Sequence, residues 1–249
     1  TTRAELAQKS VDAILDFGEK GFPGILVETI AIFINNLAAP ANTKVFSLTH
    51  RLHLTQPQAY IFDPELPYWI IYRNQLFDSV CRKLDFDVFE VFRDRQLTNK
   101  LLSSSGELRV LKSRNLSDDG KEILDIPGYD SYISYAAAKP LSVFQYLDAP
   151  NVYLTPNMTY KPRMMKKPPH CVVNGSLAIL IPKGGIVPTE KQLAYFSSEE
   201  YRAFYQIARN FQTRSLNVDA CSVFFYGLLR DEAKPAPEKF DTSVQLSFL

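Results

Sequence analysis

Two apolar segments near the start of the chain are separated by a loop rich in glycine and proline. Residues 11–17 (VDAILDF) are compact and apolar, and residues 25–34 (ILVETIAIFI) are longer and rich in β-branched side chains. Short apolar runs divided by Gly, Gly-Phe-Pro and Gly are typical of strands joined by a turn. The pattern therefore predicts a strand pair at the start of the chain.

Residues 35–42 follow this pair and contain Ala-Ala-Pro, which predicts a linker. We place the internal boundary there, between residues 1–40 and residues 41–249. A chain of 249 residues is long enough for one large domain or two small ones, so such a division is compatible with its length.

Beyond the linker, the sequence mixes strands and helices without regular alternation. Residues 67–84 predict a helix with Pro67 in its first turn, and Ser197 followed by Glu200 predicts the capping box of a second helix. The buried stripe of that second helix is expected to contain Tyr201, Phe204, Tyr205, Ala208 and Phe211. Predicted strands cover residues 45–54, 87–92, 108–111, 121–126, 152–155, 176–181 and 222–229, with a hairpin between 108–111 and 121–126 around Ser-Asp-Asp-Gly. This irregular order predicts a mixed α+β fold.

The overall charge balance limits how the chain could bind nucleic acid. It has 28 basic and 27 acidic residues and a net charge of +1. This balance excludes a uniformly basic surface, so any contact with nucleic acid must come from local clusters of basic side chains.

The cysteines and the apolar segments indicate in which cellular compartment the protein is expected. The three cysteines, Cys81, Cys171 and Cys221, are odd in number and far apart, which favours free thiols over a disulfide framework. The first ten residues carry charges and no apolar core of a signal peptide, and the longest apolar run, residues 30–34, is too short to cross a bilayer. We expect a soluble cytoplasmic protein that does not contact a membrane.

The densest basic cluster lies where acidic residues are missing. No Asp or Glu occurs from Ala149 to Thr189, and this stretch contains Lys161, Arg163, Lys166 and Lys167 within seven positions. Three prolines in the same segment predict an extended, exposed loop. Such a loop suits contacts with DNA phosphates, which fix the register of a protein on a duplex. The alternative is a solvated basic loop with no partner.

Two further clusters combine basic side chains with amides. One consists of Arg93, Arg95 and Gln96 at the end of a predicted strand, and the other of Lys112, Arg114 and Asn115. Arginine, glutamine and asparagine carry planar groups that read guanine and adenine edges in the major groove. If the strand continued through residues 93–95, the two arginines would point to the same side. The alternative is that Asp94 or another carboxylate pairs with these arginines structurally.

Patterns for metal binding or nucleophilic catalysis are weak. His50 and His53 lie in a predicted strand without a cysteine or carboxylate at a useful spacing, and His170 and Cys171 are adjacent. No Gly-x-Ser-x-Gly elbow and no glycine-rich phosphate loop occurs. Four acidic residues could serve as the metal ligands of a nuclease: Asp63, Glu65, Asp85 and Glu90. No lysine completes a recognisable nuclease pattern with them, so this interpretation is weak.

Several longer motifs extend over nearly the whole chain. Two lie in the predicted strand pair, on either side of Phe22: Val11-Asp-Ala-Ile-Leu-Asp-Phe-Gly18 and Val27-Glu-Thr-Ile-Ala-Ile-Phe-Ile34. The others are Leu66-Pro-Tyr-Trp-Ile-Ile-Tyr-Arg-Asn74, Phe92-Arg-Asp-Arg-Gln96, Leu111-Lys-Ser-Arg-Asn115, Tyr129-Asp-Ser-Tyr-Ile133, Val173-Asn-Gly-Ser176 and Ala208-Arg-Asn-Phe-Gln-Thr-Arg-Ser-Leu-Asn-Val-Asp219, which includes Arg214. The first two resemble the final strand pair of the catalytic domain in adenine-specific DNA methyltransferases of type II restriction-modification systems. The others resemble the target-recognition region that follows that domain.

The resemblance implies a division of roles along the chain. Residues 1–40 would be the last strands of an α/β methyltransferase catalytic domain, and residues 41–249 a mixed-sheet DNA target-recognition domain. Double-stranded DNA would be the partner, together with a catalytic methyltransferase half or subunit. DNA contacts would come from the three basic clusters and from Arg214, and adenine as the target base is implied by the family alone.

Two departures from the family concern catalysis. The family binds S-adenosylmethionine through a glycine-containing loop and holds the flipped adenine with an Asn-Pro-Pro-Tyr or similar tetrapeptide. The chain contains no such loop, and its one Pro-Pro, Pro168-Pro169, is flanked by Lys167 and His170. Because a base-modifying enzyme must grip the extruded base, we expect no methyl transfer and no bound cofactor from this chain alone. The alternatives are a specificity subunit that needs a catalytic partner, a restriction nuclease, or a complete methyltransferase with an unrecognised cofactor site.

Overall fold

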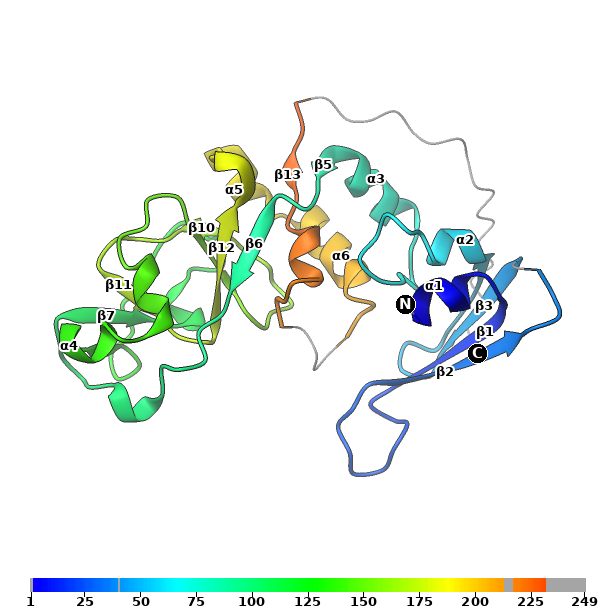
Figure 1. The fold of residues 1–249 in the computed structure, drawn as a ribbon, viewed down its shortest axis with the longest axis horizontal. Helices are drawn as coiled ribbons and strands as arrows, with labels where there is room; N and C mark the ends of the chain where they lie inside the picture. The colour runs from blue at the N-terminus through cyan, green and yellow to red at the C-terminus, as the bar shows by residue number, and fades with distance from the viewer. Residues whose placement is uncertain (1, 40, 213–216, 232–249) are drawn as a thin grey trace. The chain divides into compact units, whose positions relative to one another are not determined.

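The computed structural model describes residues 2–39, 41–212 and 217–231. Within this part of the chain, contacts divide into two units. The first contains residues 2–82 and 206–212, and the second contains Lys83–Tyr205 and residues 217–231. Both units mix short helices with small sheets, so the predicted α+β class is confirmed at this level (Figure 1).

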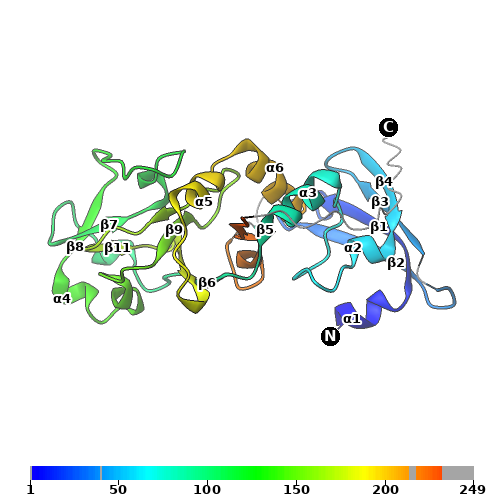
Figure 2. The same ribbon diagram turned by 90° about the horizontal axis from the view of Figure 1, so that it is seen from above.

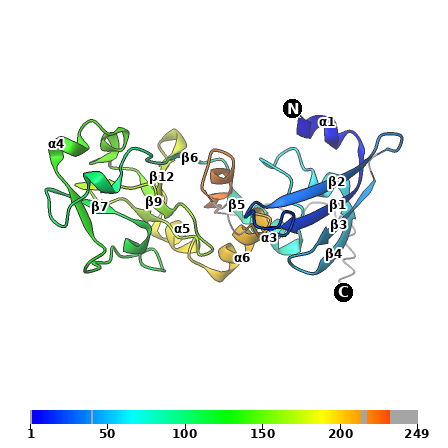
Figure 3. The same cartoon turned by 90° about the horizontal axis from the view of Figure 1, so that it is seen from below.

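The first unit contains one four-stranded mixed sheet in the order β2-β1-β3-β4 (Figure 3). β1 is central: it pairs antiparallel with β2 and parallel with β3, and β3 pairs antiparallel with β4. The elements are α1 (Thr2–Ala7), β1 (Ser10–Gly18), β2 (Thr29–Asn35), β3 (Asn42–Ser47), β4 (Leu52–Pro57), α2 (Gln58–Ile61) and α3 (Gln75–Lys83), whose last residue belongs to the second unit. The predicted strand pair is confirmed as β1 and β2, although the second strand begins at Thr29 and not at residue 25.

The boundary between the units lies after Arg82 and not after residue 40. The physical reason is the pairing of β1 with β3, in which Ile14 is opposite Val45, so residues beyond 41 complete the sheet that β1 begins. Gln58 fixes the same junction, because its side chain accepts a hydrogen bond from the Val11 amide at 2.7 Å and donates to the Lys9 carbonyl at 2.8 Å.

Two predicted elements of the first unit differ in the structure. Residues 45–54 form no single strand, because β3 ends at Ser47 and the chain turns before β4, with Arg51 at a φ of +50°. The predicted helix over 67–84 begins only at Gln75. Before it, the Ile71 amide donates to the Asn210 side chain at 2.9 Å, and the Asn74 side chain accepts from the Phe77 amide at 3.0 Å, which starts the helix.

The second unit contains three small sheets. β10-β9-β12-β6 is antiparallel, β11-β7-β8 is mixed, and β13-β5 is a two-stranded pair. The strands are β5 (Leu84–Asp85), β6 (Phe89–Phe92), β7 (Leu108–Leu111), β8 (Ser131–Ile133), β9 (Tyr153–Pro156), β10 (Met165–Lys166), β11 (Cys171–Val173), β12 (Leu177–Pro182) and β13 (Leu228–Leu229). The helices are η1 (Asn99–Leu101), η2 (Ser113–Asn115), α4 (Tyr135–Ala138), η3 (Ser142–Tyr146), η4 (Lys183–Gly185), α5 (Glu190–Tyr195), α6 (Glu199–Ala208), which continues into the first unit, and η5 (Ser222–Phe225).

One apolar core joins the two larger sheets of the second unit, which lie next to each other (Figure 2). Val110 of β7 and Val172 of β11 are paired in the mixed sheet, and both are almost completely buried. Leu154 of β9 and Ile179 of β12, paired in the antiparallel sheet, belong to the same buried cluster. The loops that leave these strands therefore start from a shared, packed base.

The hairpin predicted between residues 108–111 and 121–126 is wrong. β7 pairs with β11 on one side and β8 on the other, and residues 121–126 contribute only an isolated bridge between Leu116 and Ile123. The predicted turn itself is present, with Gly120 at a φ of +72° and its amide donating to the Ser117 carbonyl at 3.0 Å. Residues 121–126 cannot pair with β7, because both hydrogen-bonding edges of that strand are already paired with β11 and β8.

Two predictions near the end of the second unit are corrected in detail. The cap of α6 is Ser198, whose hydroxyl accepts from the Tyr201 amide at 3.1 Å, whereas the Ser197 hydroxyl donates to the Asp119 carbonyl. The predicted buried stripe is confirmed for the four members that lie in the helix: Tyr201, Phe204, Tyr205 and Ala208. The predicted strand over 222–229 is a short 3-10 helix followed by the two residues of β13.

Across the described residues, the structure contains no helix with the length and apolar character that a bilayer span requires.

Candidate nucleic-acid interface

The loop of residues 174–176, between β11 and β12, ties together the segments that carry the predicted DNA-binding residues. Its Ser176 hydroxyl accepts from the Ser113 amide at 2.9 Å, and its Asn174 amide donates to the Leu111 carbonyl at 3.1 Å. On the other side, the Ser176 carbonyl accepts from the Asn157 amide at 2.9 Å. The loops that follow β7 and β9 are thus held to one short segment.

Gly175 brings the loop after β6 to the same place. A side chain at this position would lie 2.7 Å from the Asp94 carbonyl oxygen, so the close approach requires glycine. The Asn157 side chain donates to the Gly175 carbonyl at 3.0 Å and accepts from the Val218 amide at 3.1 Å. The first two predicted clusters therefore start from neighbouring, mutually anchored loops.

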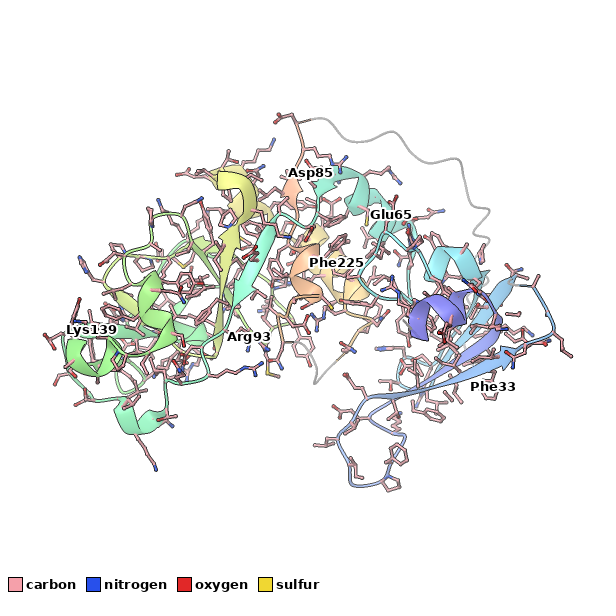
Figure 4. The ribbon with its side chains drawn as sticks, in the orientation of Figure 1. Phe33, Glu65, Asp85, Arg93, Lys139 and Phe225 are labelled. Atoms are coloured by element: carbon pink, nitrogen blue, oxygen red, sulfur yellow. The ribbon has the colours of Figure 1, made fainter. Side chains whose placement is uncertain are left out.

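In the first cluster, neither arginine has an acidic partner in the part of the chain that the structure describes. β6 ends at Phe92, so strand alternation does not set the directions of Arg93 and Arg95, and Figure 4 shows Arg93 just past the end of that strand. Arg93 is half-buried, and its Nη1 lies 3.5 Å from the Asn157 Oδ1, while Arg95 is exposed. Asp94 is buried, and its Oδ2 accepts from the Leu97 amide at 2.8 Å. Among the described residues, no carboxylate forms an ion pair with either arginine, Asp94 included.

Gln96 has a structural role at the edge of this cluster. Its Oε1 accepts both from the Ser142 amide at 2.7 Å and from the Ser142 hydroxyl at 2.6 Å. Reading adenine needs the same oxygen as an acceptor for the N6 amino group. The prediction that Gln96 reads a base is therefore corrected: its carbonyl oxygen anchors the loop to η3.

Asn115 of the second cluster is also structural, although the sequence placed it among the DNA-binding residues. Its side chain is fully buried and accepts from the Lys112 amide at 2.9 Å. It donates to the Leu124 carbonyl at 3.0 Å and to Asp130 Oδ1 at 2.6 Å. With every polar atom engaged inside the unit, Asn115 has none left for a base edge.

Lys112 and Arg114 both lie against one aromatic ring. The Lys112 ammonium lies 3.9 Å and the Arg114 guanidinium carbon 4.6 Å from the centre of the Tyr129 ring. Lys112 is half-buried and also donates to the Tyr129 carbonyl and to the Ser131 hydroxyl, the latter at 2.9 Å. Desolvation lowers the pKa of Lys112, Asp130 opposes the shift and Arg114 adds to it. Arg114 is exposed.

The third cluster is split between buried and exposed side chains, and the predicted exposed loop is only partly correct. Arg163 is 8% exposed and donates to the carbonyls of Ser113 at 3.2 Å and Leu116 at 3.3 Å. Lys167 is 4% exposed and donates to the carbonyl of Leu147 at 2.7 Å. Burial lowers the pKa of Arg163 and of Lys167, because desolvation disfavours the charged form. These two residues hold the segment in place and are unavailable for phosphates.

Lys161 and Lys166 remain exposed, as predicted. Lys161 lies 3.5 Å from an Asp118 carboxylate oxygen, a surface pair with little energetic weight. Lys166 is the last residue of the edge strand β10, and no ion pair to it occurs in the described part of the chain. Arg214 lies outside the described residues.

Tyr129 and Asn157 are the site residues that the sequence interpretation did not assign. Tyr129 was part of a recognised motif, but the motif does not show that its ring lies against two cations. Asn157 is preceded by a buried strand and carries no distinctive local pattern; its contacts depend on chain segments sixty residues apart. Over residues 2–39, 41–212 and 217–231, no three His, Cys, Asp or Glu side chains are grouped as metal ligands.

Comparison of the chain with protein-family models and with curated protein sequences found no match.

Proposed function

We propose that the second unit is a sequence-specific recognition module for double-stranded DNA. The observation that carries the proposal is the set of arginines Arg93, Arg95 and Arg114, which lie on loops anchored to the same 174–176 segment and have no carboxylate partner among the described residues. Guanidinium groups on a fixed scaffold suit contacts with phosphates and with base edges.

The packed base of these loops favours sequence-specific DNA binding over non-specific electrostatic binding. Base readout requires donors held in fixed positions, and sites built on rigid elements hold them better than free loops do. Asn115, Arg163 and Gln96 supply that rigidity by using their polar atoms inside the unit. Lys161 and Lys166 add exposed positive charge that phosphates attract.

We further propose the finer assignment that the resemblance implies: a target-recognition module of an adenine-specific DNA methyltransferase from a restriction-modification system. The first unit supports it, because parallel pairing such as that of β1 with β3 is typical of α/β sheets. In this assignment, β1 and β2 belong to the end of the catalytic sheet, and β3 and β4 complete that sheet. The chain by itself transfers no methyl group, and S-adenosylmethionine is bound by another part of the enzyme.

The edge of the first sheet supports a catalytic half or subunit as partner. β2 is an edge strand, and its side chains Ile30, Phe33 and Ile34 are 49%, 54% and 40% exposed (Figure 4, Phe33). Phe33 and Ile34 point to opposite faces because they are consecutive in a strand. An edge that is apolar on both faces suits a strand that continues into a larger covered sheet, as in a specificity subunit joined to its catalytic partner.

Removing two of the arginines tests the proposal through salt dependence. In the variant Arg93→Gln/Arg95→Gln, the slope of log binding constant against log salt concentration is expected to fall by up to about 2, since each lost phosphate contact removes about 0.9. The measurement is fluorescence anisotropy with a labelled duplex at several salt concentrations. The matched control is Lys139→Gln/Lys191→Gln, which removes the same charge from exposed positions after α4 and in α5. Equal slopes for the two variants would reject the arginine loops as the DNA-binding surface.

A further inference from the structure

Arg114 is held in a defined orientation at the surface of the second unit. It lies in η2, its side chain is exposed, and its guanidinium carbon is 4.6 Å from the centre of the Tyr129 ring. A guanidinium that lies on an aromatic ring is attracted to the ring electrons and loses fewer conformations when it binds. The plane of Arg114 is therefore restrained before any ligand arrives.

The ring that supports Arg114 is itself fixed from two sides. Lys112 donates to the carbonyl of Tyr129 and to the Ser131 hydroxyl, which binds the segment after the ring. Asp130 accepts from the Ile126 amide at 3.0 Å and from the Asn115 side chain at 2.6 Å, which binds the same loop to η2. Arg114 thus lies on a ring whose own backbone is attached to the helix that carries Arg114.

Asp130 keeps its negative charge in this arrangement. Desolvation raises its pKa, but hydrogen bonds from the Ile126 amide and Asn115, together with the charge and hydrogen bond of Arg109, outweigh it, and the pKa lies below its usual value. The charged carboxylate is accordingly a lasting part of the support for the Tyr129 loop at neutral pH.

The other candidate base readers in the described residues lack this combination of freedom and support. Arg95 is exposed, but within the described ranges no aromatic ring lies against its guanidinium. Gln96 and Asn115 use their carbonyl oxygens inside the unit. The Lys112 ammonium donates to the Tyr129 carbonyl and to the Ser131 hydroxyl. Arg93 contacts the side chain of Asn157. The amides that would read adenine are occupied, whereas the restrained fork of Arg114 remains exposed.

We propose that Arg114 reads a guanine in the major groove of the recognised duplex, with Tyr129 as its positioning residue. This inference rests on the proposed function, which it extends to a feature of the target: a G·C pair at one fixed position. The planar fork of arginine donates two parallel hydrogen bonds to O6 and N7 of guanine, a pattern that no other base presents. The Tyr129 ring sets the plane in which the fork meets the base edge.

The test uses the full chain and the motif that it selects from randomised duplex DNA. Competition binding is then measured against duplexes in which each base pair of that motif is replaced in turn. Arg114→Ala is expected to lose about 10- to 100-fold of its preference at one G·C pair and to keep the preferences at all other positions. Tyr129→Leu is expected to weaken the preference at the same pair, and Tyr129→Phe, which keeps the ring, is expected to retain it.

Each outcome separates the inference from the proposed function. If the unaltered chain selects no motif, the proposed function fails, and the inference fails with it. If it selects a motif but Arg114→Ala keeps every preference, or loses affinity equally for all sequences, only the inference fails. Arg114 is exposed, so its removal leaves the core untouched, and an unchanged melting temperature of the variant excludes unfolding as the cause.

Discussion

Replacing Arg73 with methionine is expected to lower the free energy of unfolding of the first unit by about 3 kcal/mol, the low end of the cost of breaking a fully buried ion pair, because this one is half-buried. Arg73 lies between two carboxylates, at 2.7 Å from Asp63 and 2.8 Å from Asp78, and its side chain is 15% exposed. It also donates to the Tyr60 carbonyl at 3.0 Å. Methionine fills much of the space but leaves two half-buried negative charges without their partner.

Trp69 makes this effect measurable in one unit. It is the only tryptophan of the chain, it belongs to the first unit, and its ring stacks on Phe62 with centres 3.8 Å apart. Urea unfolding followed by tryptophan fluorescence therefore reports on that unit. The matched control is Lys44→Met, which removes an exposed charge from β3 and is expected to change little. A loss below about 1 kcal/mol for Arg73→Met, the range of an exposed pair, would contradict a structural role for this network.

Replacing Asn115 with leucine is expected to destabilise the second unit by about 3 kcal/mol, since each buried polar group left unpaired costs about 1–3 kcal/mol. The change keeps the volume but removes all three hydrogen bonds of the buried side chain, to Lys112, Leu124 and Asp130. The loss of the bond to Asp130 also loosens the loop that carries Tyr129. Binding to all DNA sequences is expected to fall together, because the scaffold is affected and not one base contact.

Hydrogen exchange of the backbone amides of β7 measures this effect within the second unit, where the fluorescence of Trp69 gives no signal. The control is Asn99→Leu in η1, where the asparagine is exposed. If Asn115→Leu exchanged like the unaltered chain and lost preference at a single A·T pair, Asn115 would be a base reader as the sequence first indicated. Faster exchange with uniform loss of binding supports the structural role.

The short buried strands were the part of the fold that the sequence predicted best. The sequence predicts strands at residues 11–17, 152–155 and 176–181, and β1, β9 and β12 match these ranges to within one residue at each end. Apolar, β-branched runs identify such strands locally. The pairing of strands could not be predicted in the same way. β7 pairs in parallel with β11, and Val110 lies opposite Val172, more than sixty positions away. No local pattern specifies a contact at that separation.

For the site, the sequence identified which segments carry cations but not which cations are buried. Lys166 and Lys167 are adjacent and chemically identical, yet only Lys166 is exposed. Lys167 is buried, with 4% of its surface exposed, and its ammonium donates to a backbone carbonyl. The prolines around them predicted an exposed loop, but proline restricts backbone angles and says nothing about what covers the chain. Arg163 was assigned to DNA as part of this basic segment, and Asn115 because its amide group is able to read adenine; neither pattern indicates burial. Desolvation depends on tertiary neighbours, and only the structure supplies them.

Sequence-specific binding to double-stranded DNA is the function that we propose for the chain. The direct measurement is a binding selection from a pool of randomised duplex DNA at near-physiological salt, followed by sequencing of the bound fraction. We expect one short motif to be enriched, with a G·C pair among its positions. Two results would contradict sequence-specific recognition. One is salt-sensitive binding that enriches no motif, and the other is the absence of any binding.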